Sequence, residues 1–313
     1  MATLNSPLPK RSQAASLGAK VVTDSIFGKS SITLKMKNLA FFGLLISALS
    51  IAMVSISGIL LWALIEGYPR LDANLILNNP SSISPLTAGY RPAIIGTTYL
   101  ISGVILIIVP LGVASAIYLE LFADKTKWYN RFFELNIQNL AGVPSIVFGI
   151  LGLAFIVRGP LSMGFVVAAG SLTVALLVLP TVILASREAI RAVPSSILEG
   201  SLAIGATLWQ SVRRQVLPAA FPGILTGVIL AVARAIGEAA PLLLVGAVTF
   251  VTFDPKFFEG GYSALPVMIY NYAGRPQEEF HVLAAAGVLV MLLLLAVINS
   301  VAVWLRAKYE KDW

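Results

Sequence analysis

The chain has 313 residues, of which 58% are hydrophobic and only 12% are charged, and its mean hydropathy is +0.87. An ordinary soluble domain carries about 25% charged residues, so this composition excludes a water-soluble protein and indicates a membrane protein. The net charge of +7 is distributed as in a membrane protein, so no nucleic-acid partner is expected, and the absence of cysteine excludes disulfide bonds and thiolate chemistry.

Six apolar stretches are long enough to cross a bilayer as helices, which takes about 20 residues. They cover residues 39–65, 93–119, 137–157, 161–185, 221–251 and 282–305, and glycine or proline interrupts some of them. The sequence therefore predicts an all-α polytopic membrane protein with six transmembrane helices surrounded by membrane lipid.

The first 38 residues are rich in Ser, Ala and Lys and predict a flexible tail. The apolar stretch that follows is too long for a cleavable signal, so we expect a retained span at 39–65 and a periplasmic loop at 66–92. If the tail is cytoplasmic, 16 of the 22 Lys and Arg residues lie in cytoplasmic segments. The positive-inside rule then predicts that both termini face the cytoplasm from the cell (inner) membrane.

The tetrapeptide Gly-Lys-Ser-Ser at 28–31 is similar to the end of a phosphate-binding P-loop. That motif requires a glycine five residues before Gly28, where Thr23 stands, and it follows a strand, which this chain lacks here. We therefore expect this chain to bind no cofactor, and any ATP and Mg²⁺ to be used by a partner.

Residues 194–218, between the fourth and fifth predicted spans, predict two short helices joined at a glycine. The spacing of a capping box occurs twice, at Ser196–Glu199 and Thr207–Gln210. Gly205 suits a left-handed helix terminus, and Pro218 is expected to end the second helix.

Two functions of this segment stay open on its chemistry. It could be an amphipathic hairpin on the lipid surface, because Trp209, Val212 and Val216 share one face of the second helix while Arg213 and Arg214 point elsewhere. It could instead be a rigid docking element that transmits force to the spans on either side.

The fifth predicted span carries two charges, Arg234 and Glu238. One stripe at helical spacing reads Gly223, Gly227, Ala231, Arg234, Glu238 and Pro241. The other side carries Ile229, Val232, Ile236 and Leu243. Small residues let another helix approach closely, so the stripe is predicted to face protein or a cavity and the bulky side to face lipid. Pro241 cannot donate to the carbonyl of Gly237 and is expected to bend the helix beside the two charges.

A charge deep in the membrane costs at least about 2.5–3.5 kcal/mol, so this pair requires a reason. A structural ion pair that locks two spans together is one interpretation. The other is an anion station, in which Arg234 binds a negative substrate and Glu238 holds the Arg between passages. Phosphate near pH 7 keeps a P–OH that a carboxylate can accept, whereas sulfate has none, so such a pair would favour phosphate.

The segment at 194–218 resembles the EAA coupling motif of ABC importer permeases. The residues that match its spacing are Glu199, Gly200, Ser201, Gly205, Leu217 and Pro218. Gly200 and Ser201 replace two alanines of the motif, and Gln215 replaces its isoleucine.

Four further stretches resemble permease subunits of high-affinity phosphate ABC importers, and the last of the four resembles the PstA-type subunit more than the PstC-type subunit. They are Ala233–Ala247, Asn139–Gly152, Leu179–Thr207 and Leu265–Phe280, and the likeness covers Arg91 to Trp313. It implies a type I (MetI-like) permease fold with a five-helix core at 93–313, and a transport subunit that is not an enzyme. It also implies a heterodimer with a PstC-type permease, a PstB-type ATPase homodimer and a PstS-type periplasmic phosphate-binding protein.

The resemblance further implies roles for the residues already described. Arg234 and Glu238 would lie on the substrate path, and the matched motif residues would couple to the ATPase. An importer of another small anion, and a secondary anion transporter, remain alternatives. A secondary transporter or channel would have no use for the capped segment at 194–218, and an intramembrane hydrolase would need a catalytic set that the spans do not offer.

Three smaller features of the sequence carry less specific expectations. His281 has no second His or Cys near it, so no metal site is expected. Arg275 with Glu278 and Glu279 could contact a binding protein or form a solvated loop. Aromatic residues near span ends suit interfacial anchoring, namely Trp62, Trp304, Trp313, Tyr68, Tyr118 and Tyr309.

Overall fold

A computed structural model describes residues 32–247 and 250–309, and most of them are helical. The chain divides into two units, residues 1–62 and 63–313. In the described part of the first unit, helix α2 (Ile32–Gly67) begins seven residues before the predicted start of the first span at Leu39. The rest of the predicted tail, with the sequence Gly-Lys-Ser-Ser, lies outside the described residues.

The second unit contains the remaining elements. In chain order they are η1 (Tyr68–Arg70), α3 (Ala73–Leu77), α4 (Arg91–Ile117), η2 (Tyr118–Phe122), α5 (Trp128–Ala141), α6 (Ser145–Leu151), η3 (Gly152–Val157), α7 (Val167–Arg191), α8 (Ser195–Ala203), α9 (Leu208–Ser211), η4 (Val212–Val216), α10 (Leu217–Gly237), α11 (Ala240–Leu244), α12 (Leu265–Ala273) and α13 (Glu278–Tyr309). Across the described residues, five helical runs are long and apolar enough to cross a membrane, and a bent pair brings the number to six. The only β interaction described is a parallel bridge between Ala247 and Tyr262.

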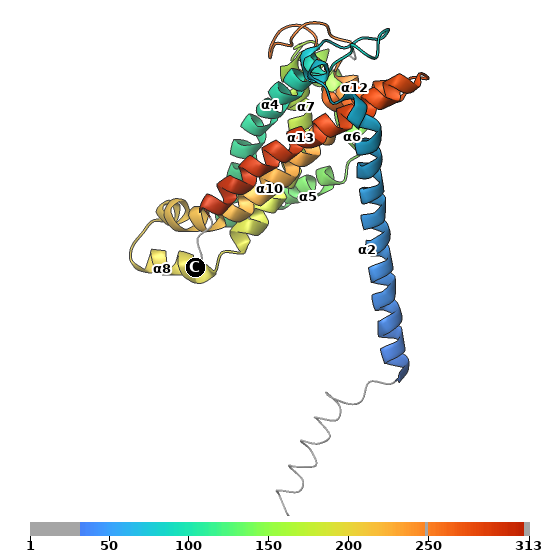
Figure 1. Cartoon of the computed structure of the whole chain (residues 1–313). Helices are drawn as coiled ribbons and strands as arrows, with labels where there is room; N and C mark the ends of the chain where they lie inside the picture. The colour runs from blue at the N-terminus through green and yellow to red at the C-terminus, as the bar shows by residue number, and fades with distance from the viewer. Residues whose placement is uncertain (1–31, 248–249, 310–313) are drawn as a thin grey trace, which may run out of the picture. The chain divides into compact units, whose positions relative to one another are not determined.

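Helix α7 is the centre of this unit and packs against both α4 and α10. The four long helices α4, α7, α10 and α13 follow one another side by side in Figure 1. The contact between α4 and α7 depends on small residues, because a Cβ at Gly103 would lie 2.6 Å from the Ser171 hydroxyl and one at Gly112 would lie 2.6 Å from Val182. Glycine at these two positions lets the helices approach closely, as is usual for helix contacts inside membranes.

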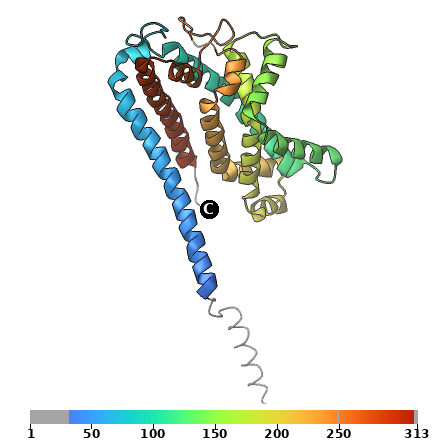
Figure 2. The same ribbon diagram turned by 90° about the vertical axis from the view of Figure 1, so that its right-hand side faces the viewer.

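The third predicted span, at 137–157, is not one straight helix, as expected for a stretch interrupted by glycine and proline. Its residues fall in two helical pieces, α5 and then α6 with η3, which are bent by 110°. Gly142, Val143 and Pro144 separate them, and Pro144 occupies the N-cap of α6. Proline disfavours helical geometry in the residue before it, so the helix ends ahead of Val143. Figure 2 shows α5, in green, running outward across the direction of the long helices.

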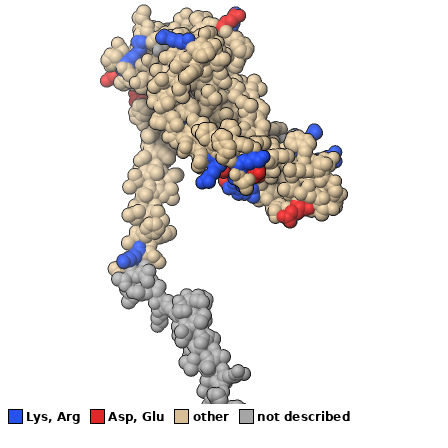
Figure 3. Space-filling view, turned by 180° about the vertical axis from the view of Figure 1, so that it is seen from behind, with Lys and Arg blue, Asp and Glu red and all other residues tan. Residues whose placement is uncertain are grey.

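Charged side chains are concentrated near the ends of this second unit. In the space-filling view of Figure 3, tan residues cover most of its middle, while blue and red residues gather toward its ends. This distribution fits a bundle whose central zone contacts lipid and whose ends contact water.

Candidate functional site

Arg234 and Glu238 contact each other at the point where α10 ends. The Arg234 Nε lies 3.4 Å from the Glu238 Oε1, and the two side chains are 42% and 17% exposed. α10 stops at Gly237, and Glu238 has extended backbone angles (φ −79°, ψ 109°) before α11 begins at Ala240. The expectation that one helix continues from 221 to 251 through both charges is therefore wrong.

Pro241 accounts for this break. It lies in the first turn of α11, where a residue without an N–H is tolerated. If α10 continued through this position, Pro241 could not donate the helical hydrogen bond to the carbonyl of Gly237. The predicted weakness beside the two charges is confirmed, but it is an interruption of the helix and not only a bend. Glu238 consequently sits on irregular backbone, which inside a membrane protein is tolerated where protein or water satisfies its polar groups.

The first two positions of the small-residue stripe of α10, Gly223 and Gly227, lie against α7. A Cβ added at Gly223 would lie 2.7 Å from the Ala189 Cβ, and one at Gly227 would collide with Ala185. Ala231 is fully buried. The prediction that these positions face protein is confirmed, whereas Arg234, at the far end of the same stripe, is exposed in the single chain.

The prediction that the bulky side of this helix faces lipid is wrong for Val232 and Ile236, whereas Leu243, which lies on α11, is 45% exposed. Val232 and Ile236 are buried, at 3% and 1% exposure, inside the largest apolar core cluster. Helix α10 contacts α4 and α13 as well as α7, so it is covered on more than one side. The side left open carries Thr226, Leu230 and Arg234.

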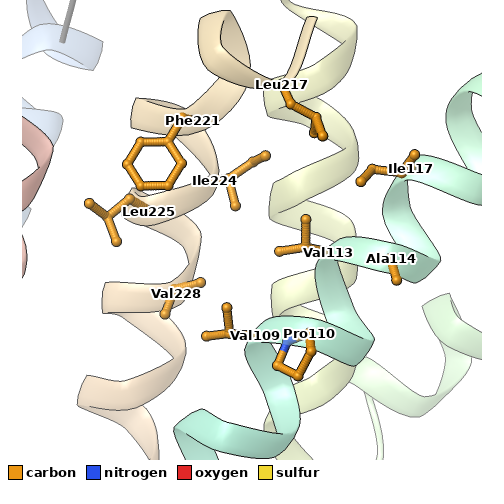
Figure 4. Close-up of a pocket in the computed structure, with 10 residues that line it drawn as sticks. All are labelled: Val109, Pro110, Val113, Ala114, Ile117, Leu217, Phe221, Ile224, Leu225 and Val228. Carbon is orange, nitrogen blue, oxygen red and sulfur yellow. The ribbon is translucent and has the colours of Figure 1, made fainter. Parts of the chain in front are cut away.

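A cavity on the α10 surface, away from Arg234, is not an anion site. It has a volume of about 420 Å³ and lies between α4 and α10. Figure 4 shows the ten side chains that line it, all of them apolar: Val109, Pro110, Val113, Ala114, Ile117, Leu217, Phe221, Ile224, Leu225 and Val228. An anion held there would lose its hydration without gaining hydrogen-bond donors.

The coupling segment, residues 194–218, contains the predicted pair of short helices, but its first cap differs. α8 begins at Ser195 with Pro194 at the N-cap position, and no side chain caps it. The predicted capping box at Ser196–Glu199 is therefore wrong. The N-cap is Pro194 (φ −54°, ψ 133°) and not Ser196, so Ser196 lies inside the first turn of the helix. Glu199 and Gly200 are exposed on α8, which stands away from the bundle in Figure 1.

The second half of the coupling segment begins as the sequence predicts. Gly205 adopts φ +88°, and the Thr207–Gln210 capping box is formed in both directions. The Ser211 hydroxyl also bonds to that of Ser201 at 2.9 Å, which joins the two halves. The open space around Gly205 shows that its left-handed backbone, and not a lack of room, requires glycine.

Pro218 does not end the second short helix as predicted. α9 continues through the π-helical turn η4 into α10 without interruption, and Pro218 lies in the first turn of α10. Within this continuous run Pro218 cannot donate a backbone hydrogen bond to the turn before it, and the π-helical turn η4, which departs from the regular α-helical pattern, lies immediately ahead of it. Of the other motif residues, Ser201 and Leu217 are half-buried.

A charged cluster that sequence reasoning missed lies beside the coupling segment. Arg187 donates to Glu134 at 2.7 Å and to Glu120 at 3.3 Å, and Arg191 donates to Glu120 at 3.0 Å. Arg187 and Glu120 are nearly buried, with side chains 6% and 9% exposed. The cluster joins η2, α5 and the last turns of α7. Three residues separate the end of α7 from the start of α8. The members of this cluster are far apart in the sequence. The only sequence signal for it is the pair of arginines, Arg187 and Arg191, near the end of α7.

Arg275 is engaged within the chain at the opposite end of the bundle. Its guanidinium lies 4.8 Å and 4.6 Å from the ring centres of Phe250 and Phe280 and donates to the Ser82 carbonyl at 2.7 Å. The ring Nε2 of His281 lies 2.6 Å from the Arg275 carbonyl oxygen. The geometry favours a role for Arg275 in closing the loops, and the described residues include no cluster of three metal-ligating side chains.

The predicted interfacial aromatics are exposed where they are described. Trp62, Trp304, Tyr68 and Tyr118 are 48–72% exposed. Trp313 and the side chain of Tyr309 lie outside the described residues. Exposure of these rings near helix ends is typical of contact with a membrane interface.

Comparison with known proteins identifies the class. Residues 108–311 match the family described as binding-protein-dependent transport system inner membrane component. The chain is 30% identical over 283 residues to the probable ABC transporter permease protein YqgI of Bacillus subtilis (strain 168), across 86% of this chain and 94% of that protein. It is 33% identical over 221 residues to the phosphate transport system permease protein PstA 1 of Mycobacterium tuberculosis (strain CDC 1551 / Oshkosh), across 70% of each.

The fold agrees with this classification. The chain superposes on the MetNI methionine ABC transporter in an inward-facing conformation with a TM-score of 0.57, at 16% identity, over 71% of this chain and 95% of that chain. This chain therefore belongs to the family of binding-protein-dependent transport system inner membrane components. It is a multi-pass membrane permease subunit of an ABC importer and not an enzyme, so ATP hydrolysis and substrate capture belong to separate partners.

Proposed function

We propose that this chain is the PstA-type permease subunit of an ATP-driven importer of inorganic phosphate. The observation that carries the proposal is the Arg234–Glu238 contact at the interruption between α10 and α11. Support comes from relatives named as phosphate transport permeases, including one 33% identical over 257 residues from Yersinia pestis.

Arg234 supplies the charge that an anion needs inside a membrane protein. Its contact with Glu238 is long, at 3.4 Å, so the guanidinium keeps donors that an oxyanion can use. The carboxylate offsets the positive charge while the path is empty, and it accepts the P–OH of a passing phosphate. The exposed face of Arg234 is then the side on which a PstC-type permease completes the path as the second half of a heterodimer.

The coupling segment gives the chain its connection to ATP. The residues that would dock on a PstB-type ATPase homodimer are Glu199, Gly200, Ser201, Gly205, Leu217 and Pro218. We place this segment and both termini in the cytoplasm, because 16 of 22 basic residues then lie inside. A PstS-type protein delivers phosphate at the other end, and ATP and Mg²⁺ are bound by the ATPase alone.

Uptake of radiolabelled phosphate by proteoliposomes tests this function. The vesicles contain this chain with its partner permease and ATPase, and the binding protein is added outside. Uptake should require internal ATP and continue when the proton gradient is collapsed. Uptake driven by the gradient without ATP would instead identify a secondary anion transporter. Uptake of a different small anion, with phosphate inert, would reject phosphate as the substrate and keep the importer.

A further inference from the structure

Helix α5 has three distinct faces. One face packs on α7 and holds Asn130, which is 5% exposed, and Ile137. The second face is open and aromatic, with four side chains 37–78% exposed: Trp128, Tyr129, Phe132 and Phe133. At 100° per residue, the exposed Arg131 and Gln138 form a third, polar strip between the other two. A membrane-spanning helix is typically apolar all round, whereas the separate apolar and polar faces of α5 are those of an amphipathic helix.

The direction of α5 fits a helix that lies along a membrane surface. It is bent by 110° from the α6–η3 run and extends outward across the direction of the long helices (Figure 2). The Arg187–Glu134 ion pair, at 2.7 Å, holds it to the last turns of α7. An amphipathic helix at the end of a transmembrane bundle buries its apolar face in the headgroup region.

Basic residues gather at the start of α5. Lys125, Lys127 and Arg131 are exposed, and Lys127 lies 5.9 Å from the ring centre of Tyr129. Of the three, only Lys125 has a carboxylate within 4.0 Å among the described residues, Glu120 at 3.6 Å. Asp124 adds one negative charge here; its carboxylate accepts hydrogen bonds from Thr126, which hold the pKa of the Asp124 carboxyl below its usual value. The group keeps a net positive charge beside the aromatic face.

The two polar residues on the aromatic face do not contradict contact with lipid. The Asn136 side chain donates to the Phe132 carbonyl at 2.7 Å, so its amide is partly satisfied within the helix. Asn139 lies near the end of α5, one turn from the bend at Gly142. Such residues are compatible with a shallow position among headgroups, and not with a deep one.

We propose that α5 is a lipid-surface helix that binds anionic phospholipid. Phe132 and its aromatic neighbours enter the headgroup boundary, while Lys127 and Arg131 bind the phosphate groups. The inner leaflet is assigned by the orientation given under the proposed function, whereas the lipid contact does not depend on phosphate transport. Through Glu134 and Arg187, the bound lipid is connected to the helix that leads into the coupling segment.

The first test locates the surface. The chain has no cysteine, so single substitutions Phe132→Cys, Gln138→Cys and Ile137→Cys can be spin-labelled in the assembled transporter, in bilayers containing phosphatidylglycerol. The label at 132 should be accessible to oxygen and shielded from a water-soluble nickel reagent. The label at 138 should show the reverse, and the label at 137 should be shielded from both. A label at 132 that is shielded from both reagents, or open to nickel, would mean that protein or water covers this face and would overturn the proposal.

The second test identifies the headgroup. Spin-labelled phosphatidylglycerol and phosphatidylcholine are compared for motional restriction by the transporter, first with wild type and then with Lys127→Gln/Arg131→Gln. A basic residue at an anionic surface is worth about fivefold in preference, so the double variant should lose selectivity for phosphatidylglycerol by up to roughly 25-fold. Arg158→Gln/Lys256→Gln, which removes the same charge elsewhere, should keep it. Equal selectivity in wild type and the first variant, or an equal loss in the control, would reject anionic lipid binding by α5.

Discussion

Arg187 on α7 and Glu134 on α5 form an ion pair 2.7 Å long, although 53 residues separate them in the sequence. The same guanidinium reaches Glu120 on η2, so one nearly buried side chain joins three elements. This junction lies just ahead of α8, and it fixes where the coupling segment leaves the bundle.

Arg187→Ala should destabilise the transporter far more than Arg191→Ala. Both arginines pair with Glu120, but their side chains are 6% and 50% exposed. Removing the buried partner leaves Glu120 less satisfied and costs about 3 kcal/mol, whereas the exposed pair contributes less than about 1 kcal/mol. Thermal unfolding of the purified complex measures the difference. Equal loss in the two variants would show that burial of this pair has no energetic weight.

Arg234→Leu should reduce phosphate uptake at least about 100-fold, since the change removes the only positive charge of this site. Assembly should be unchanged, because the Arg234 side chain is 42% exposed and its one described ion pair is long. Uptake in proteoliposomes and co-purification of the partner subunits measure the two effects. Arg158→Leu, which removes an exposed arginine elsewhere, is the matched control and should transport normally. Normal uptake by the Arg234 variant would reject the anion role.

Glu238→Gln should narrow the preference for phosphate over sulfate by about tenfold. The carboxylate only accepts hydrogen bonds and therefore favours an anion with a P–OH, whereas the amide can also donate to sulfate. Titration calorimetry of the permease–ATPase complex reads this preference directly, provided that the binding protein is left out. An unchanged ratio of affinities would show that the carboxylate does not meet the anion.

Gly205→Pro should weaken binding of the ATPase at least about tenfold. Proline requires φ near −65°, and Gly205 has φ +88°, so the two halves of the coupling segment could not keep their arrangement. Gly260→Pro is the matched control, because Gly260 also has a left-handed backbone (φ +70°) but lies outside the coupling segment, and this variant should bind the ATPase normally. Pull-down of the ATPase compares them. Full recovery of the ATPase by the Gly205 variant would argue against docking through this segment.

The features that sequence reasoning found are those set by neighbouring residues. The Thr207–Gln210 box and the backbone of Gly205 depend on a few positions only, and both were predicted. Ser196 has the same capping-box spacing, but Pro194 occupies the N-cap position of α8. This too is a local effect that the sequence shows. Pro144 and Pro241 are also visible in the sequence. The hydropathy of a segment, however, does not distinguish a straight helix from a bent or interrupted one.

What sequence reasoning missed depends on contacts between distant elements. Val232 and Ile236 have the bulk of lipid-facing residues, and only the packing of α4 and α13 around α10 buries them. Glu120, Glu134 and Arg187 carry no shared spacing, so no pattern could group them. The contact of Arg234 with Glu238 was predicted from spacing alone, although the helix that suggested it ends at Gly237.

The uninterrupted helical run from Leu208 to Gly237 makes one rod of 30 residues, with the coupling segment at one end and Arg234 near the other. At ~1.5 Å per residue the rod is about 45 Å long, so a tilt of roughly 5° about one end displaces the other by about 4 Å. The break at Glu238 ends the rod there and leaves α11 outside its sweep. If the rod pivots near α9, a small movement of α9 produces a larger displacement of the Arg234 guanidinium at the other end.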